Sequence, residues 1–266
     1  GTGMGWDGPR QDAVANMTSL IGKTALVTGG SRGIGRSIAL ALADAGAFVV
    51  LTYHVQREAA EQVVETIEQS GGQAWALQMA LEQDQSIATA VQWTVATLDA
   101  VDILVNNAAM AQERAFLRLT PDDWAMMLRV NLQGPFRLCQ EVLPHMQQYS
   151  WGRIVNIVSL GGQIGGTLQP HYAAAKSGLE SLTRSLARLY GRDGITVNAV
   201  APGLVATGMV ADELATPAGQ AKVASIPLGR IATPDEVGSV VAFLCSNEAG
   251  YITGATLNVN GGLYMG

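Results

Sequence analysis

Ionisable and nucleophilic side chains are scarce in this chain of 266 residues, which has three lysines, three histidines and two cysteines. Charged residues make up only 14%, with a net charge of −6 and no basic cluster, so the sequence excludes a nucleic-acid-binding surface. Cys139 and Cys245 lie in apolar stretches without motif spacing, which indicates reduced core residues rather than a disulfide. The histidines have no metal-ligand spacing, so we expect no metal site.

Long unbroken apolar runs are also missing. The longest uncharged stretches, Ile154–Ala175 and Gly194–Ala211, are interrupted by Gly, Pro and Asn, which is typical of strands and turns rather than of a membrane span. No secretory leader is evident, so we expect a cytoplasmic enzyme. Gly1–Asn16 is rich in glycine and Met17 is a plausible native start. We interpret residues 1–19 as an N-terminal extension or a non-native remnant, and residues 20–266 as one domain.

Strand-like and helical segments alternate along residues 20–266. The strands are continuous Val, Ile and Leu runs, which indicates burial on both faces. The pattern predicts an α/β fold, a single doubly wound Rossmann domain whose seven-stranded parallel sheet carries helices on both faces. The expected strands are Lys23–Thr28, Phe48–Tyr53, Gln73–Met79, Val101–Val105, Arg153–Ser159, Thr196–Ala201 and Thr256–Asn260. The expected helices are Ile34–Ala45, Arg57–Gln69, Ser86–Leu98, Pro121 to about Gln148 with interruptions, Tyr172–Tyr190 and Thr233–Asn247.

Four distinctive loops follow ends of these strands, at residues 28–35, 106–109, 159–166 and 202–207. In a parallel sheet, ligands bind beyond the carboxyl ends of the strands. Glycines in the first loop let backbone amides approach a pyrophosphate, and the following helix adds its positive N-terminal end. Tight packing alone would also explain one glycine-rich turn. Four such loops on one edge favour a nucleotide site.

The end of the second strand bears on which nucleotide binds there. A sheet that binds NAD usually places an acid at this position, where it holds the ribose 2′-hydroxyl. This chain has Tyr53 and His54 instead, and no Asp or Glu occurs between Asp44 and Glu58. Arg32 lies in the glycine turn, where it can meet a 2′-phosphate or remain a solvated turn residue. The pattern favours NADP(H).

Tyr172 and Lys176 stand four residues apart, a spacing expected by chance about 0.07 times in a chain of this composition. On a helix the two side chains share one face. The phenol titrates near 10 in water, and a nearby ammonium favours its ionised form. With Ser159 thirteen residues upstream, the set can donate a proton to an oxygen or remove one. This chemistry is typical of hydride transfer between a carbonyl and an alcohol.

Together these residues resemble the short-chain dehydrogenase/reductase family from roughly Leu20 to the C-terminus. The matching motifs are Thr28-Gly29-x-x-x-Gly33-x-Gly35, Asn106-Asn107-Ala108-Ala109, Asn131, Ser159, Tyr172-x-x-x-Lys176 and Pro202-Gly203-x-x-x-Thr207. The C-terminal run Tyr251–Gly262 is most similar to the 3-oxoacyl-ACP reductase branch, which implies NADPH-dependent reduction of a 3-oxoacyl thioester and a place in fatty-acid metabolism. A reductase or dehydrogenase of a free alcohol, sugar or cyclic ketone is the alternative. A regulator that binds NADP(H) without turnover is disfavoured by the intact set.

The resemblance assigns a role to each catalytic residue. Tyr172 is the general acid in reduction, Ser159 hydrogen-bonds the substrate oxygen, Lys176 also holds the nicotinamide ribose, and Asn131 anchors a water that links Lys176 to solvent. Ala80 stands where many relatives have an adenine-contacting Asp, which leaves that contact to the backbone and Leu81. The implied cofactor-binding residues are Gly29, Ser31, Arg32, Gly33, Ile34, Gly35, Tyr53, His54, Leu81, Asn107, Ala108, Ala109, Tyr172, Lys176, Pro202, Gly203, Val205 and Thr207.

Two kinds of partner follow from the resemblance. An acyl carrier protein would dock on a basic rim, yet the segment before the fifth strand reads Gln147-Gln148-Tyr149-Ser150-Trp151, and Asp193 follows Arg192. Carrier docking is therefore less firmly implied than ketone reduction. The low charge and the apolar helices around Ala125–Leu143 and Leu179–Tyr190 favour a homotetramer with closed symmetry, although both helices can also simply face the core.

Overall fold

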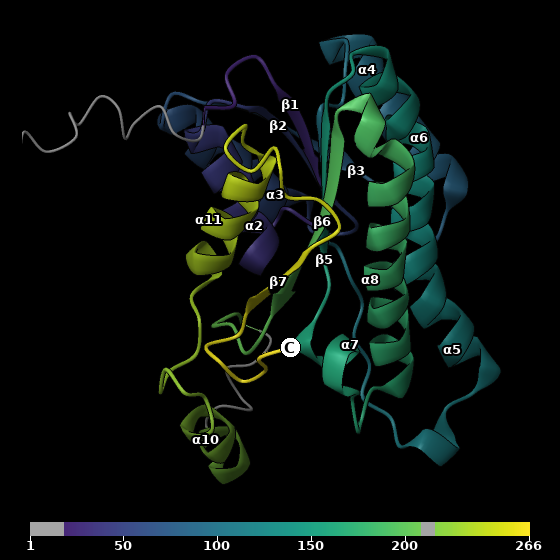
Figure 1. Cartoon of the computed structure of the whole chain (residues 1–266), viewed down its shortest axis with the longest axis vertical. Helices are drawn as coiled ribbons and strands as arrows, with labels where there is room; N and C mark the ends of the chain where they lie inside the picture. The colour runs from purple at the N-terminus through teal and green to yellow at the C-terminus, as the bar shows by residue number, and fades with distance from the viewer. Residues whose placement is uncertain (1–18, 209–215) are drawn as a thin grey trace, which may run out of the picture.

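Seven parallel strands form the centre of this computed structural model, which describes residues 19–208 and 216–266 (Figure 1). Their order across the sheet is β3-β2-β1-β4-β5-β6-β7, and every neighbouring pair is parallel. Their bounds are β1 Thr24–Val27, β2 Phe48–Tyr53, β3 Gln73–Gln78, β4 Ile103–Asn106, β5 Gly152–Ile157, β6 Ile195–Pro202 and β7 Thr256–Val259. The order reverses between β1 and β4, so the crevice for a ligand is expected at the carboxyl ends of these strands.

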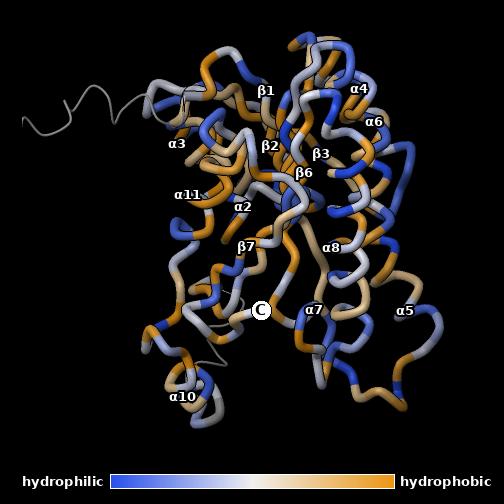
Figure 2. The backbone as a smooth tube through the Cα atoms, in the orientation of Figure 1, coloured by the Kyte–Doolittle hydropathy of each residue, from blue (hydrophilic) through white to orange (hydrophobic). Residues whose placement is uncertain are grey.

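Helices cover both faces of the sheet, with α2, α3 and α11 on one side and α4, α6 and α8 on the other (Figure 1). The central strands β1, β4, β5 and β6 are buried along their whole length, whereas the edge strands β3 and β7 are partly exposed and Figure 2 shows β7 as mixed in hydropathy. Each helical layer encloses its own apolar core. The predicted doubly wound α/β fold is confirmed. The helix bounds are α2 Gly33–Asp44, α3 Arg57–Gln69, α4 Asp84–Leu98, α5 Pro121–Leu128, α6 Gly134–Gln148, α7 Leu160–Ile164, α8 Pro170–Tyr190, α10 Pro217–Ala224 and α11 Pro234–Cys245.

The helix expected from Pro121 to about Gln148 is interrupted, as predicted, and the interruption lies at one place. A π-helical turn, η2 (Arg129–Gln133), separates α5 from α6. Two further helices were not predicted, α7 and α10, because five and eight residues are too few to show a helical period. Single-turn 3₁₀ segments occur at η1 (Phe116–Arg118) and η3 (Gly191–Asp193).

The N-terminal extension expected at residues 1–19 lies, apart from its last residue, outside the described residues. Leu20, the expected first residue of the domain, is 1% exposed and its N–H donates to Ala45 O at 2.7 Å; the boundary itself stays a prediction. Cys139 and Cys245 are free and buried, as predicted, and burial raises the pKa of each thiol to about 12.

Within residues 19–208 and 216–266, every helix is too short or too polar to cross a lipid bilayer.

Candidate active site

The glycine turn after β1 is held against the loop after β4 by Thr28. Its buried hydroxyl accepts from the N–H groups of Asn107 and Ala108, at 3.0 and 2.9 Å, and the Asn107 amide donates to Thr28 O and Gly29 O. Close packing explains part of the turn, because a Cβ at Gly35 would lie 2.1 Å from Gly29 O. Sequence motifs identified Thr28 only as the first residue of the turn, not as the link between the two loops.

The first helical turn of α2 presents backbone donors to the crevice. Its N-cap, Arg32, makes no side-chain cap hydrogen bond, and the first turn carries no acid. Gly33 has a φ of +54°, and a Cβ there would lie 3.3 Å from Thr207 Cγ2, so the turn and the loop after β6 are close together. Gly33 and Thr207 are therefore brought together. A binding role for these two residues and for the other predicted residues of the two loops stays a prediction, namely for Gly29, Ser31, Arg32, Ile34, Gly35, Pro202, Gly203 and Val205.

The end of β2 carries no acid of its own, as the sequence indicated, but an acid from another segment approaches it. His54 Nε2 is 3.5 Å from Glu82 Oε1, and the Glu82 carboxylate comes from the loop after β3. Since β3 is the next strand in the sheet, the loop after β3 lies beside the end of β2. Glu82 is distant from Tyr53 in the sequence, so local patterns around Tyr53 do not reveal this acid. Leu81 is 7% exposed and packs in the apolar core, which leaves its side chain little surface for an adenine.

Ser159, Tyr172 and Lys176 come together at the carboxyl end of β5. Ser159 is the N-cap of α7, and its hydroxyl accepts from Gly161 N at 3.1 Å. Lys176 is 2% exposed, its Nζ donates to Ile157 O at 2.7 Å, and it lies 5.6 Å from the centre of the Tyr172 ring. Burial lowers the pKa of this ammonium to about 8.

The pKa of Tyr172 shifts in the direction opposite to the prediction. Burial raises the pKa of the phenol, and a hydrogen bond with Ser159 lowers it by less. The charge of Lys176 was expected to favour the phenolate, but burial of the ring hydroxyl, which disfavours the charged form, is the largest cause of the shift. The phenol therefore stays protonated at neutral pH, and this is the form that can donate a proton.

Asn131 lies in the π-helical turn η2 and is fully buried. Its Oδ1 accepts from Met110 N at 3.2 Å, and its Nδ2 donates to Met110 O at 3.0 Å and to Met127 O at 3.2 Å. The side chain thereby joins the loop after β4 to the helix. The relayed water that the resemblance implies stays a prediction.

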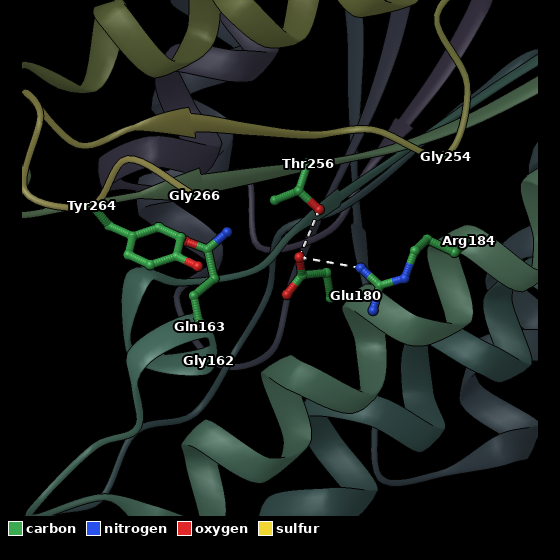
Figure 3. A pocket seen from close by; sticks show the side chains of 8 residues that line it. All are labelled: Gly162, Gln163, Glu180, Arg184, Gly254, Thr256, Tyr264 and Gly266. Carbon is green, nitrogen blue, oxygen red and sulfur yellow. Dashed lines mark hydrogen bonds and ion pairs between the residues drawn. The ribbon is translucent and has the colours of Figure 1, made fainter.

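A cavity of about 390 Å³ lies beside α7, with Gly162 and Gln163 in its lining. Glu180 at its wall accepts from Thr256 Oγ1 at 2.9 Å and pairs with Arg184 at 3.3 Å (Figure 3). None of the four catalytic residues lines the cavity, but Gly162 in its wall is next to Lys176, since a Cβ on Gly162 would lie 3.0 Å from Lys176 Cβ. No group of three or more His, Cys, Asp and Glu that could hold a metal occurs among the described residues.

Comparisons with known proteins point to one group of enzymes. The family model described as Enoyl-(Acyl carrier protein) reductase matches residues 29–264. The chain is 44% identical over 247 residues to 3-oxoacyl-[acyl-carrier-protein] reductase FabG of Pseudomonas aeruginosa, covering 93% of this chain and 99% of that protein. FabG of Aquifex aeolicus is 44% identical over 246 residues, covering 92% and 98%.

Solved structures are similar throughout the fold. A dehydrogenase/reductase from Sinorhizobium meliloti has a TM-score of 0.89 at 36% identity, covering 96% of this chain and all of that one. A protein from Beutenbergia cavernae, assigned provisionally as an NAD(P)-dependent gluconate 5-dehydrogenase and solved with NADP at low occupancy, has a TM-score of 0.88 at 36% identity, covering 92% and 98%.

Proposed function

Since the chain belongs to the short-chain dehydrogenase/reductase family, we propose that it is an NADPH-dependent reductase that converts a 3-oxoacyl thioester into a 3-hydroxyacyl thioester. The observation that carries the proposal is the convergence of Ser159, Tyr172 and Lys176 at the carboxyl edge of the sheet, beside the glycine turn. The curated relatives named as 3-oxoacyl-ACP reductases support the substrate class.

The residues at the crevice fit a dinucleotide. The amides at the start of α2 have no side-chain cap, and both Gly29 and Gly33 have positive φ, as an anion-binding turn requires. Lys176 and the Asn107–Ala109 loop would hold the nicotinamide end. Bound NADPH supplies the hydride that reaches the carbonyl carbon.

The protein's own groups handle the oxygen and the proton. As negative charge develops on the carbonyl oxygen, Ser159 donates a hydrogen bond to it and Tyr172 transfers its phenolic proton. The raised pKa of Tyr172 keeps that proton in place until the transfer. Lys176 stabilises the phenolate that remains, because its ammonium is on the same face of α8. Asn131 would hold the water that returns a proton through Lys176.

We propose NADPH rather than NADH as the reductant. Arg32 is exposed at the turn after β1, and His54 is exposed at the end of the adjacent β2. A guanidinium and an imidazole there can bind a 2′-phosphate. Glu82 beside His54 opposes this preference, because its charge has the sign of the phosphate. The preference therefore depends mainly on Arg32.

The rim of the crevice favours an acyl substrate over a sugar. Phe116 and Leu117 are 67% and 92% exposed, and Ile164 and Leu168 are 60% and 53% exposed. The segments that carry them are adjacent, since Arg114 N donates to Leu168 O. An exposed apolar rim is a typical ligand-binding surface for hydrocarbon. A free alcohol, sugar or cyclic ketone remains the second candidate, supported by the provisional gluconate dehydrogenase among the similar structures.

An acyl carrier protein is the proposed carrier of the acyl group, in the cytoplasm. The basic residues available near the fifth strand are Arg188 and Arg192, whereas Gln147 bonds Asp193 at 2.8 Å. This limited charge predicts weak docking, so thioesters of small thiols should also be substrates.

We also propose a homotetramer. Apolar side chains on α5, α6 and α8 are exposed, including Trp124, Met126, Phe136 and Leu189. Beside them an apolar groove of about 350 Å³ is lined by Leu128, Leu132, Gln133, Phe136 and Leu182. Such a face is typical of a subunit interface. Light scattering at micromolar concentration tests it: a mass near that of one 27.8 kDa chain refutes the tetramer.

The deciding experiment for the activity is NADPH oxidation, followed by absorbance, with a panel of substrates. We expect turnover with 3-oxoacyl thioesters and little with sugars or cyclic ketones. The reverse ranking would support the second candidate. NADPH binding without turnover on any substrate would instead favour a regulator.

A further inference from the structure

The loop after β4 runs beside the loop that follows Ser159. We call residues 107–119 the strap and residues 160–169 the substrate loop; the strap passes beside α7 before it reaches α5 (Figure 1). Arg114 N donates to Leu168 O at 2.9 Å, and Gln169 Nε2 is 3.5 Å from Glu113 Oε1. Because of these two contacts, a displacement of the strap would also displace the substrate loop.

Gln112 connects the strap to the first turn of α8. Its Nε2 donates to Asp123 Oδ1 at 3.1 Å, and its Oε1 lies 3.3 Å from Nε2 of His171. A carboxylate only accepts hydrogen bonds, which fixes the orientation of the Gln112 amide and makes its oxygen face the imidazole. His171 Nε2 must then carry the hydrogen. The tautomer of His171 is set by this contact.

His171 is fully buried and immediately precedes Tyr172. Its Nδ1 is buried and has no hydrogen-bond partner within the described part of the chain, so a second proton on the ring would be unsatisfied. Burial lowers the pKa of His171, and Arg114 lowers it further while Asp123 raises it. The imidazole is thus a neutral donor held in one orientation.

Asp123 anchors the other end of the contact. Besides Gln112, it accepts from Arg114 Nη1 at 2.5 Å and from both the N–H and the hydroxyl of Thr120, at 2.9 and 2.7 Å. The hydrogen bonds from Thr120 are the main cause that lowers the pKa of Asp123 to about 2. The anchor is fixed to the start of α5 and stays ionised at any ordinary pH.

We propose that Gln112 and His171 form a clamp that positions the substrate loop over Tyr172 and so determines which ketones fit. Both are positioning residues, since neither is placed to touch the reacting atoms. Through the clamp, the strap is hydrogen-bonded to His171, the residue next to Tyr172. The strap is also hydrogen-bonded to Leu168 O, and Leu168 is one of the exposed apolar residues of the rim. The kinetic part of this inference rests on the ketone reduction proposed above.

The test uses Gln112→Met, which keeps the length of the side chain but removes both hydrogen bonds. Gln147→Met is the matched control, because it breaks another Gln–Asp contact, to Asp193, away from the crevice. With a small-thiol 3-oxoacyl thioester we expect KM to rise about threefold to tenfold in Gln112→Met, since one hydrogen bond is typically worth this factor. The Kd for NADPH should be unchanged, and the control should match the wild type.

Amide hydrogen exchange tests the clamp without turnover. Exchange across residues 160–169 should be about tenfold faster in Gln112→Met than in the control. Gln112→Met with a lower Tm but unchanged exchange and KM would overturn the clamp. If the wild type reduces no ketone, the proposed function fails while the exchange result still decides the clamp. His171→Asn is the second variant should Gln112→Met not fold, and it should give the same faster exchange.

Discussion

Lys23 and Lys176 lie at opposite edges of the parallel sheet and have very different surroundings. At the amino edge, Lys23 pairs with Asp102 at 3.2 Å and lies 3.9 Å from the centre of the Trp151 ring. At the carboxyl edge, Lys176 is buried with a backbone carbonyl, Ile157 O, as its hydrogen-bond acceptor. Among the ion pairs of the described residues, Lys176 takes part in none. A paired charge stabilises one edge, and an unpaired buried charge is available for chemistry at the other.

Among substitutions at the carboxyl edge of the sheet, Tyr172→Phe should have the largest effect on turnover. This substitution removes only the transferable proton, so turnover should fall about 10²–10⁴-fold while NADPH binding remains. Steady-state rates and fluorescence titration of NADPH measure the two quantities. If more than about a tenth of the turnover survives, Tyr172 is not the general acid.

Lys176→Met should separate function from stability. Turnover should fall at least about a hundredfold and NADPH should bind more weakly, because the ammonium serves both steps. The cofactor-free fold should become more stable at pH 7, by up to about 3 kcal/mol, because the buried ammonium that disfavours folding is gone.

The pH dependence of stability checks the same point. The pKa of Lys176 is lowered in the folded state to about 8, from 10.5 when unfolded. Between these values the unfolded chain binds more protons, so this group makes wild-type stability rise as the pH increases from about 8. Denaturant titrations at pH 7 and 9 should show the rise in the wild type and a smaller one in Lys176→Met. Equal curves would mean that Lys176 titrates normally.

Arg32→Ala should lower the ratio of NADPH use to NADH use about tenfold. The main cause should be weaker binding of NADPH, since one charge-assisted contact with its phosphate is lost. Glu82→Gln is its counterpart and should widen the preference about threefold, because a like charge is removed near the phosphate. The ratio of kcat/KM for the two cofactors measures both. Equal use of NADPH and NADH by the wild type would contradict the proposed specificity.

The smallest effect is expected at the amino edge. Asp102→Asn should lower the free energy of unfolding by about 1 kcal/mol, since it weakens the pair with Lys23 and the bond from Thr24 N. Turnover should not change. A large loss of activity would show that the two edges are coupled, and the contrast between Lys23 and Lys176 would fail.

Local patterns in the sequence predicted most of the fold. Phe48–Tyr53 and Arg57–Gln69 were predicted to the residue, because an apolar run and a helical period end at clear turn signals. The π-helical turn at Asn131 was not predicted, since one inserted residue leaves the helical composition unchanged. The catalytic residues were found because they lie in short motifs.

Contacts between distant loops could not be predicted in the same way. Glu82 is close to His54 only because β3 is next to β2, and Gln112 meets His171 across 59 positions of sequence. The direction of the pKa shift of Tyr172 was also missed. It depends on burial by the whole fold, which neighbouring residues in the sequence do not reveal.

The π-helical turn limits how the chain can change in length. Each residue of a helix rotates the next by about 100°. Deleting one residue from Arg129–Gln133 would allow a regular α-helix from α5 to α6, with every backbone bond in its ordinary place. It would also turn the side chains of α5 by about that angle relative to α6, and would disturb the turn in which Asn131 bonds both Met110 and Met127 O. An otherwise favourable repair of the helix would thus dismantle the site, so substitutions rather than deletions are the changes this segment can accommodate.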